Sequence, residues 1–295
     1  MPRLYVVATP IGNLSDLSPR ALEVLGSCDL IAAEDTRVTR QLLQHFGVRT
    51  PCVSNHRHNE EEKAAPLVAR MLEEDLSVAL VTDAGTPAVS DPGSFLVDEA
   101  LKAGIEVLAV PGPTAMAAAL SVSGFDTREF AFYGFLPRKR GELAEKLRAI
   151  AASGVPVAVV HESPHRVIEL VRTIAGTLPG CRISASCDLT KLYEKTIRGT
   201  ADEVLALLSA NEKAEKGEYG LVLDLHGTDV GKEKEEAAAL TPELALLERM
   251  LQGETLREAA AALNGAGLRR NEVYRARRRF ARFWRKRNEE PEGEG

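Results

Sequence analysis

Aromatic residues and cysteines are both scarce in this chain of 295 residues. Phe, Trp and Tyr together make up 5% of it, whereas aliphatic residues are plentiful, which favours α/β architecture. The four cysteines, Cys28, Cys52, Cys181 and Cys187, show no C-x-x-C spacing. Neither a zinc site nor a disulfide framework is therefore indicated, and we expect reduced, mostly buried thiols.

Long apolar runs are also missing. No run approaches the roughly 20 residues that a transmembrane helix requires. The N-terminal MPRLYVVATP breaks at Pro10 after a very short apolar stretch, unlike a signal peptide. We therefore expect a soluble, cytoplasmic protein with no membrane partner, long enough for two domains with a substantial core in each.

The usual phosphate-binding motifs are absent from the turn VTDAGTPAVSDPG, residues 81–93. It matches neither the dinucleotide fingerprint G-x-G-x-x-G nor a P-loop. It offers Gly85, the carboxylates of Asp83 and Asp91, and no cation. Such a turn repels phosphate and suits a neutral or cationic ligand held by carbonyls, hydroxyls and backbone N–H groups. An ordinary strand-to-helix turn is the alternative, because Gly and Pro punctuate turns generally.

Strand and helix patterns alternate through the first part of the chain. We expect strands at 4–8, 29–33, 78–81 and 106–110, a helix that starts at Ser18-Pro19 and closes at Gly26, and a helix at 39–46 closed by Gly47. Alternation of this kind predicts βαβ units and a mostly parallel sheet. The loops TPIGNLSD, EDTR, DAGTPAVSD and PGPTA should then share one rim at the carboxyl ends of the strands, where such sheets bind ligands.

A second series of strands is expected after the linker-like SGFDTRE, at 131–135, 155–160, 183–187 and 219–225. The predicted organisation is an N-terminal α/β domain (1–122), a second α/β domain (123–228) and a ligand cleft between them. Residues 229–288 follow as a polar linker and a basic helical domain, and 289–295 as a disordered tail. Within that helical domain, TLREAAAALNGAGLRRNEVYRARRRF shows the helix, Gly-containing turn, helix spacing of helix-turn-helix units.

Charge is distributed very unevenly. Residues 268–288 hold ten basic side chains and one acid, Glu272, a net charge of +9; since the whole chain carries −6, the remainder carries −15. A basic end on an acidic body indicates a polyanionic partner for that end. A solvated helix face is the alternative, although so many like charges would repel one another without an anion nearby.

Six motifs agree with one known family. In this order and near these spacings, LYVVATPIGNLSD, AEDTR, VTDAGTPAVSDPG, VPGPTA, ESPHR and LTK resemble the tetrapyrrole-methylase-like class of S-adenosylmethionine enzymes. Within that class they resemble the ribosomal RNA small subunit methyltransferase I branch, which methylates a cytidine ribose 2′-hydroxyl in 16S rRNA. The resemblance spans residues 4–225 and continues into the helical end. Tetrapyrrole methylases proper carry an acid in place of Thr86 and lack the basic helices.

The resemblance implies S-adenosylmethionine as the cofactor, 16S rRNA of the small ribosomal subunit as the partner, and a homodimer. A cationic sulfonium suits the acidic, phosphate-free turn. Motif matching assigns cofactor contacts to Pro10, Asp83, Ala84, Gly85, Thr86, Val89, Thr114, Ala115 and Leu189. Loop packing is the alternative for Pro10 and Val89.

Methyl transfer to a ribose oxygen needs alignment, desolvation and some handling of the hydroxyl proton. Candidate bases are the carboxylates of Asp16, Glu34, Asp35, Asp83 and Glu194. Asp35 and Arg37 are assigned to proton transfer and phosphate contact, with a helix N-cap at Asp35 as the alternative. Lys191 is assigned to RNA phosphate, with pairing to Glu194 as its alternative.

Substrate contacts are expected from the SPHR motif and from the basic helices. The candidates are His165, Arg166, Arg269, Arg270, Arg277 and Arg278. A capping role after Ser163-Pro164 competes for the first two. His56 and His58 lack a third ligand, so no metal is expected.

Three other functions are alternatives. A ligand-sensing transcription factor would present selected polar side chains to base edges, whereas the second basic helix is almost entirely Arg, which suits phosphate contact. The intact rim motifs speak against a noncatalytic nucleic-acid-binding module. A small-molecule tetrapyrrole methyltransferase is the nearest competitor, but it has no use for a strongly basic end.

Overall fold

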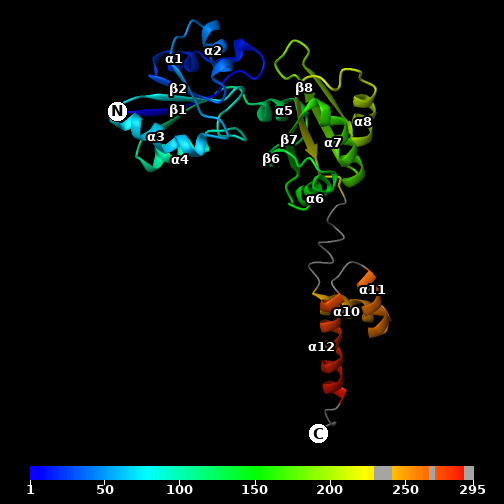
Figure 1. Cartoon of the computed structure of the whole chain (residues 1–295). Helices are drawn as coiled ribbons and strands as arrows, with labels where there is room; N and C mark the ends of the chain where they lie inside the picture. Colours follow the sequence, from blue (N-terminus) through cyan, green and yellow to red (C-terminus); the bar gives the residue numbers. More distant parts are fainter. Residues whose placement is uncertain (229–240, 266–269, 289–295) are drawn as a thin grey trace. The chain divides into compact units, whose positions relative to one another are not determined.

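The computed structural model describes residues 1–228, 241–265 and 270–288, without the side chains of 265, 270 and 283–288. The chain forms two compact units, Met1–Thr228 and Asp229–Gly295 (Figure 1). The predicted linker before residue 241, the turn at 266–269 with Arg269, and the predicted tail at 289–295 lie outside the described residues.

The N-terminal half of the first unit is built on a fully parallel sheet with strand order β3-β2-β4-β1-β5. Its strands are β1 (Arg3–Val7), β2 (Leu30–Ala33), β3 (Cys52–Ser54), β4 (Val78–Val81) and β5 (Glu106–Val110). Around them lie η1 (Leu14–Asp16), α1 (Pro19–Ser27), α2 (Thr36–His45), α3 (Glu60–Glu73), α4 (Ser94–Lys102) and α5 (Ala115–Ser123). All five strands therefore end at the same edge of the sheet.

Two separate apolar cores cover the two faces of this sheet. Leu4, Leu80, Met71 of α3 and Leu96 of α4 pack on one face. Side chains of α1 and α2, with Ile31 of β2, pack on the other. Figure 1 shows these two helix pairs on opposite sides of the sheet. Strands covered on both faces explain why β2 and β4 are continuous apolar runs without alternation.

The second half contains a mixed sheet with order β6-β7-β10-β8-β9. Its elements are β6 (Ala131–Phe135), α6 (Arg140–Ala151), β7 (Val157–Glu162), α7 (Pro164–Thr177), β8 (Arg182–Cys187), β9 (Lys195–Thr200), α8 (Ala201–Ser209) and β10 (Tyr219–Asp224). Only β6 and β7 are parallel, and the other three pairings are antiparallel. The mostly parallel sheet expected for the first half is thus confirmed there, whereas the second sheet is mostly antiparallel. The loop from β8 to β9, for example, is too short for the crossover that a parallel pairing needs.

Two local expectations also need correction. The first helix does not close at Gly26 but continues to Ser27, although Ser18 caps its start as predicted, its Oγ accepting from Ala21 N at 3.1 Å. Strand β9 was not anticipated, because KTIRGT is polar and half exposed.

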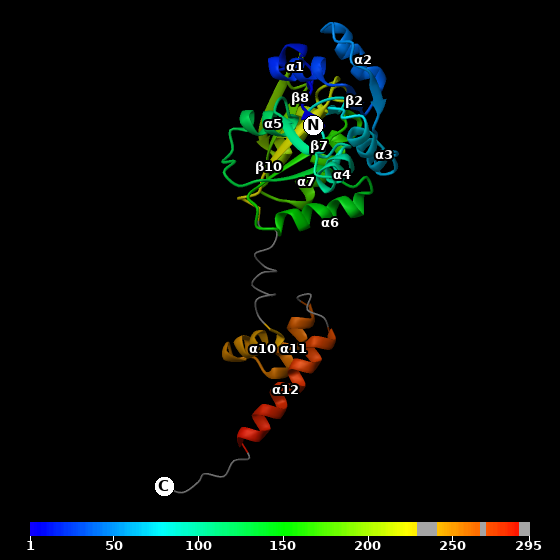
Figure 2. The ribbon, with the colours of Figure 1, turned by 90° about the vertical axis from the view of Figure 1, so that its left-hand side faces the viewer.

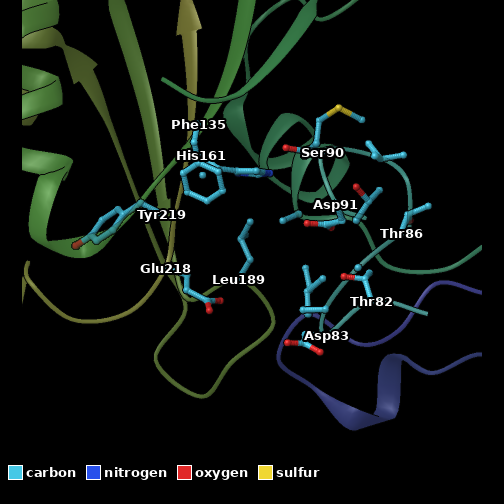
Figure 3. A pocket seen from close by; sticks show the side chains of 18 of the residues that line it. Thr82, Asp83, Thr86, Ser90, Asp91, Phe135, His161, Leu189, Glu218 and Tyr219 are labelled. Carbon is cyan, nitrogen blue, oxygen red and sulfur yellow. The ribbon is translucent and has the colours of Figure 1, made fainter. Parts of the chain in front are cut away.

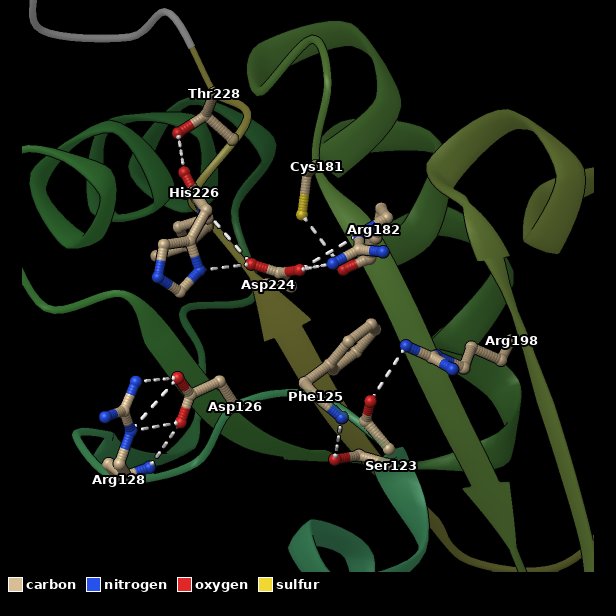
Figure 4. Close-up of polar contacts among 12 residues, drawn as sticks. Ser123, Phe125, Asp126, Arg128, Cys181, Arg182, Arg198, Asp224, His226 and Thr228 are labelled. Carbon is tan, nitrogen blue, oxygen red and sulfur yellow. Dashed lines mark hydrogen bonds and ion pairs between the residues drawn. The ribbon is translucent and has the colours of Figure 1, made fainter.

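The segment that joins the two halves is fixed to the second sheet (Figure 4). The ring of Phe125 lies 4.4 Å from the guanidinium of Arg198 and 5.2 Å from that of Arg182. Arg182 Nε donates to the buried carboxylate of Asp224 at 2.9 Å, and His226 Nδ1 lies 2.8 Å from the same carboxylate. Burial raises the pKa of Asp224, but these hydrogen bonds outweigh it and lower the pKa overall.

A shared core also joins the halves. Ile11 after β1 and Leu120 of α5 pack against Val159 and Val222 of the second sheet. Surfaces from both halves can therefore line one rigid cavity.

The second unit is a bundle of α10 (Pro242–Leu251), α11 (Leu256–Gly265) and α12 (Arg270–Asn288) with its own core (Figure 2). Helices on either side of the expected turn are thus present. Leu263 of α11 and Val273 of α12 are buried in this core, with Leu256 packed against it. No helix among the described residues has the length and apolarity to cross a membrane.

Candidate functional site

A cavity of about 430 Å³ opens at the carboxyl edge of the parallel sheet and is lined from both halves of the first unit (Figure 3). Its N-terminal lining consists of Ile11, Glu34, Thr82, Asp83, Ala84, Gly85, Thr86, Val89, Ser90, Asp91, Thr114, Ala115 and Met116. The other side consists of Phe132, Phe135, His161, Glu162, Ser163, Pro164, Leu189, Glu218, Tyr219 and Gly220. Within the described residues no Lys or Arg lines it.

The four expected rim loops meet through direct hydrogen bonds. Thr9 N donates to Gly85 O at 2.9 Å, and Gly85 N donates back to Thr9 O at 3.1 Å. Thr86 Oγ1 donates to Pro113 O at 3.3 Å, and Thr82 Oγ1 donates to Glu34 Oε2 at 2.6 Å. The prediction that these loops share one rim is confirmed.

The loop after β4 (residues 82–93, hereafter the β4 loop) contains unusual backbone conformations. Gly85 has φ +90°, and the non-glycine residues Ala88 and Ser90 have φ +61° and +70°. Each such non-glycine position costs about 1–3 kcal/mol and persists only where its surroundings enforce it. Arg57 donates to Ser90 O at 3.0 Å, and the buried Glu60 accepts from Gly93 N at 2.6 Å. The β4 loop is therefore held from outside in a shape that it would not adopt alone.

Five carboxylates line the cavity, and four have partners. Glu34 accepts from Thr82 and from Asp83 N, and Asp83 accepts from Asp35 N at 3.0 Å. Glu162 accepts from Ser163 N at 2.8 Å, and Glu218 accepts from Lys191 at 3.0 Å.

Asp91 is the exception. Within the described residues its carboxylate has no hydrogen-bond or ion-pair partner, although it is partly buried. Burial first, and then the negative charges of Glu34 and Asp83, raise its pKa to about 6, against the opposing effect of Arg57. Burial likewise raises the pKa of Asp83. Asp91 is thus an unengaged carboxylate of raised basicity that faces the cavity.

The opposite side of the cavity is aromatic. The ring of His161 lies 5.0 Å from that of Phe132 and 6.0 Å from that of Phe135. Burial lowers the pKa of His161, so its imidazole is neutral at pH 7. Burial also raises the pKa of Tyr219, which keeps its hydroxyl protonated.

The LTK loop packs against the first rim loop and contributes Leu189 to the cavity lining. Asp188 and Thr190 on either side of Leu189 have φ +53° and +67°. Thr190 Oγ1 accepts from Asn13 N at 3.1 Å. A Cβ on Gly12 would lie 2.5 Å from Lys191 Cγ, so only glycine permits this approach.

The residues predicted to contact the cofactor mostly lie together. Eight of the nine line the cavity: Asp83, Ala84, Gly85, Thr86, Val89, Thr114, Ala115 and Leu189. Pro10 is buried and does not line it, whereas its neighbour Ile11 does.

Of the candidate catalytic residues, Glu34 and Asp83 line the cavity, whereas Asp35, Arg37, Lys191 and Glu194 lie outside its lining. Asp35 is the N-cap of α2, accepting from Arg37 N at 2.8 Å, and the bound guanidinium of the exposed Arg37 lowers the pKa of Asp35 to about 2. Lys191 lies 3.2 Å from Asp188 and 3.0 Å from Glu218. Partial burial lowers the pKa of Lys191, but these carboxylates together raise it. Glu194 accepts from Thr190 N at 2.6 Å and so fastens the LTK loop.

The predicted substrate contacts fall into two groups. His165 is exposed in the first turn of α7, while Arg166 lies 3.2 Å from Glu162 and donates to Pro137 O at 3.1 Å. Arg277 and Arg278 are exposed on α12 in the second unit. Arg269 and the side chain of Arg270 lie outside the described residues.

Sequence reasoning assigned no role to several lining residues. His161 and Glu162 belong to the stretch VHESPHR, and Asp91 belongs to the turn after β4. These motifs could therefore have identified the three residues as candidates. Phe135 and Glu218 lie in or beside strands without a motif, and only the fold brings them to the cavity.

No group of three or more His, Cys, Asp and Glu side chains suited to a metal ion occurs among the described residues. His56 and His58 contact each other instead, with ring centroids 6.0 Å apart.

Comparison with known proteins gives concordant results. A profile described as Tetrapyrrole (Corrin/Porphyrin) Methylases matches residues 3–205. The chain is 40% identical over 267 residues to Ribosomal RNA small subunit methyltransferase I of Xylella fastidiosa, covering 89% of this chain and 95% of that protein. It is 41% identical over 275 residues to the protein of the same name from Escherichia coli O157:H7, covering 92% and 93%. A solved diphthine synthase shares the fold, with TM-score 0.59 at 17% identity over 75% of this chain and 89% of that one.

Proposed function

Because the chain belongs to the ribosomal RNA small subunit methyltransferase I family, within the tetrapyrrole methylases, we propose that it methylates a ribose of 16S rRNA. The proposed reaction is transfer of a methyl group from S-adenosylmethionine to the 2′-hydroxyl of a cytidine in the small ribosomal subunit. The observation that carries the proposal is the cavity between the two halves, which unites the rim motifs in one place.

The lining residues fit S-adenosylmethionine. Carboxylates suit the cationic sulfonium, while Leu189, Met116 and Ala115 offer apolar contact to an uncharged adenosine. The absence of Lys and Arg among the described lining residues disfavours a phosphorylated cofactor in the same space. When bound, S-adenosylmethionine would supply the activated methyl group that the ribose oxygen accepts.

The protein's part is alignment and removal of the hydroxyl proton. We propose that the Asp91 carboxylate accepts this proton, since it is the one lining carboxylate without a partner among the described residues. A carboxylate of raised pKa is a stronger base than an exposed Asp and is still ionised at pH 7. Other candidate bases are already engaged. Glu34 and Asp83 accept hydrogen bonds within the lining, and Asp35 and Glu194 accept backbone hydrogen bonds outside it.

The basic helix α12 supports RNA as the substrate. Arg277, Arg278 and Arg279 are exposed on it; Arg279 lies 3.3 Å from Glu243, and Arg278 packs over the ring of Tyr274. Closely spaced arginines suit phosphates rather than base edges. We propose that this unit is an RNA-docking arm, and that the enzyme acts as a homodimer, which light scattering at several concentrations would test.

A tetrapyrrole methyltransferase is the second candidate, because the matched family includes such enzymes. It is disfavoured, since the relatives at about 40% identity are named as rRNA methyltransferases, and this chain aligns with nearly their full length.

Incubation with undermethylated small ribosomal subunits and labelled S-adenosylmethionine, followed by nucleoside mass spectrometry, tests the proposal. We expect label in 2′-O-methylcytidine from 16S rRNA and none in a uroporphyrinogen control. Label in the tetrapyrrole alone, or in a base instead of a ribose, would reject it.

A further inference from the structure

We propose that Phe135 and Arg138 form a docking site for an unpaired nucleotide of the RNA at the mouth of the cavity. The ring of Phe135 stacks on a base, and Arg138 contacts the adjoining phosphate. This inference rests on the proposed function, in that the substrate is RNA. It assigns part of the RNA contact to the catalytic unit itself and not to the basic helix α12.

A β-bulge in β6 turns Phe135 toward the cavity. Phe132 pairs with Val159, and the next pairing joins Phe135 to His161, so β6 advances three residues while β7 advances two. Gly134, inside the bulge, has φ +59°. Residues three apart on a regular strand face opposite sides of the sheet, whereas here both phenylalanines contact His161. The bulge is therefore what brings the second aromatic ring to the cavity.

Phe135 contributes little to the core. Its exposed fraction is 65%, whereas Phe132 packs against the core that joins the two halves. Figure 3 shows Phe135 beside His161, on the side of the cavity opposite Asp83. An exposed aromatic ring on a rigid strand offers a flat surface on which any base can stack.

The turn after Phe135 supplies positive charge. Arg138, Lys139 and Arg140 are all exposed; Lys139 lies 3.0 Å from Glu142, and Arg140 lies 4.0 Å from Glu169. Arg138 has no hydrogen-bond or ion-pair partner within the described residues. An exposed aromatic ring and an unpaired cation three residues along the chain offer the two kinds of contact that single-stranded RNA receives, stacking on a base and positive charge for the backbone.

The ESPHR motif fixes this turn. Arg166 donates to Pro137 O at 3.1 Å, and its guanidinium lies 3.2 Å from Glu162, whose side chain is fully buried. Arg166 is thus a positioning residue that links α7 to the turn between Phe135 and Arg138. This contact gives Arg166 an indirect route to substrate binding.

The Phe135→Ala and Arg138→Ala variants of the full-length protein test the proposal. Phe135→Trp serves as conservative replacement, and Phe95→Ala as matched control, since Phe95 is 42% exposed on α4 but does not line the cavity. Three quantities are measured: cofactor affinity by calorimetry, binding of small subunits across a salt series, and the kcat and KM of methylation.

Phe135→Ala should weaken subunit binding and raise KM by about 5- to 150-fold, the range for loss of one stacked base, without changing cofactor affinity. Phe135→Trp should restore binding. Arg138→Ala should make the slope of log affinity against log salt shallower by about 0.7, the effect of one phosphate contact on a single strand.

Unchanged subunit binding in Phe135→Ala would overturn the proposal, as would a loss of cofactor affinity, which would assign the ring to the adenine instead. Because subunit binding is measured separately from turnover, failure of the proposed methylation can be distinguished from failure of the docking site. A protein that binds subunits through Phe135 but does not methylate them would reject the methylation and retain the docking site.

Discussion

Replacing Asp91 by Asn should raise the stability of the protein and abolish most of its activity. The side chain keeps its size but loses its charge and its ability to accept a proton. The raised pKa means that the folded state disfavours the ionised carboxylate. The resulting loss of folding stability is absent below the ordinary pKa of 3.8, grows as the pH rises to about 6, and is complete above about pH 6.

The size of the stability effect follows from the shift. Moving from 3.8 to about 6 is roughly two pH units at 1.36 kcal/mol each, an upper limit near 3 kcal/mol. Asp91 is only about half buried, so solvent screening reduces this to about 1 kcal/mol. For a unit of this size that is an increase in Tm of about 2–4 °C. The increase should appear at pH 8 and vanish at pH 4.

Thermal denaturation at both pH values tests the stability effect, with Asp98→Asn as control. Asp98 lies 2.7 Å from Lys102 on the surface of α4, and loss of such an exposed pair changes stability by at most about 1 kcal/mol. Single-turnover methylation tests the catalytic effect. We expect a 10²- to 10⁴-fold lower rate for Asp91→Asn, and a wild-type rate that falls as pH drops below about 6. A variant that is destabilised at pH 8 yet methylates at the parental rate would refute the reasoning.

Three further changes have distinct expected outcomes. Gly85→Val should abolish binding of S-adenosylmethionine in calorimetry while the fold persists, because a β-branched residue at φ +90° costs about 1–3 kcal/mol and distorts the β4 loop; unchanged affinity would remove that loop from the site. Asp35→Asn and Arg37→Ala should keep cofactor affinity but lower turnover; because Asn also caps helices, an unaltered rate in Asp35→Asn would leave Asp35 a purely capping role. Deleting residues 240–295 should spare cofactor binding, weaken subunit binding and flatten its salt dependence, whereas parental affinity and slope would make α12 structural.

The parallel half of the fold was predictable because its signals are local. Buried strands such as β4 appear as short apolar runs, and Ser18-Pro19 marks a helix start by its own chemistry. The antiparallel arrangement of the second sheet depends on which strands pair over long separations. The exposed, polar β9 gave no periodic signal from which that pairing could be inferred.

The residues of the site likewise divide into those that the sequence could predict and those that it could not. Rim loops that follow parallel strands must converge, so most of the predicted cofactor contacts lie on one cavity. Asp35 caps α2 and lies outside the cavity lining, because a residue that follows a strand can cap the next helix as well as face the ligand. The position of Phe135 at the cavity could not be predicted, since it is the bulge at Gly134 that places this ring on the same side of the sheet as Phe132.

The separate core of the helical unit has a consequence for its folding equilibrium. Four of the seven buried core residues described there are alanines, which bury little apolar surface, and small units are marginal in stability. Anything that binds only the folded form shifts such an equilibrium by mass action, by about 2.7 kcal/mol at a hundredfold excess over Kd. Calorimetry should therefore show this unit melting in its own transition. If it docks on RNA, that transition alone should move upward as RNA is added, so that occupancy by its partner sets how much of the arm is folded.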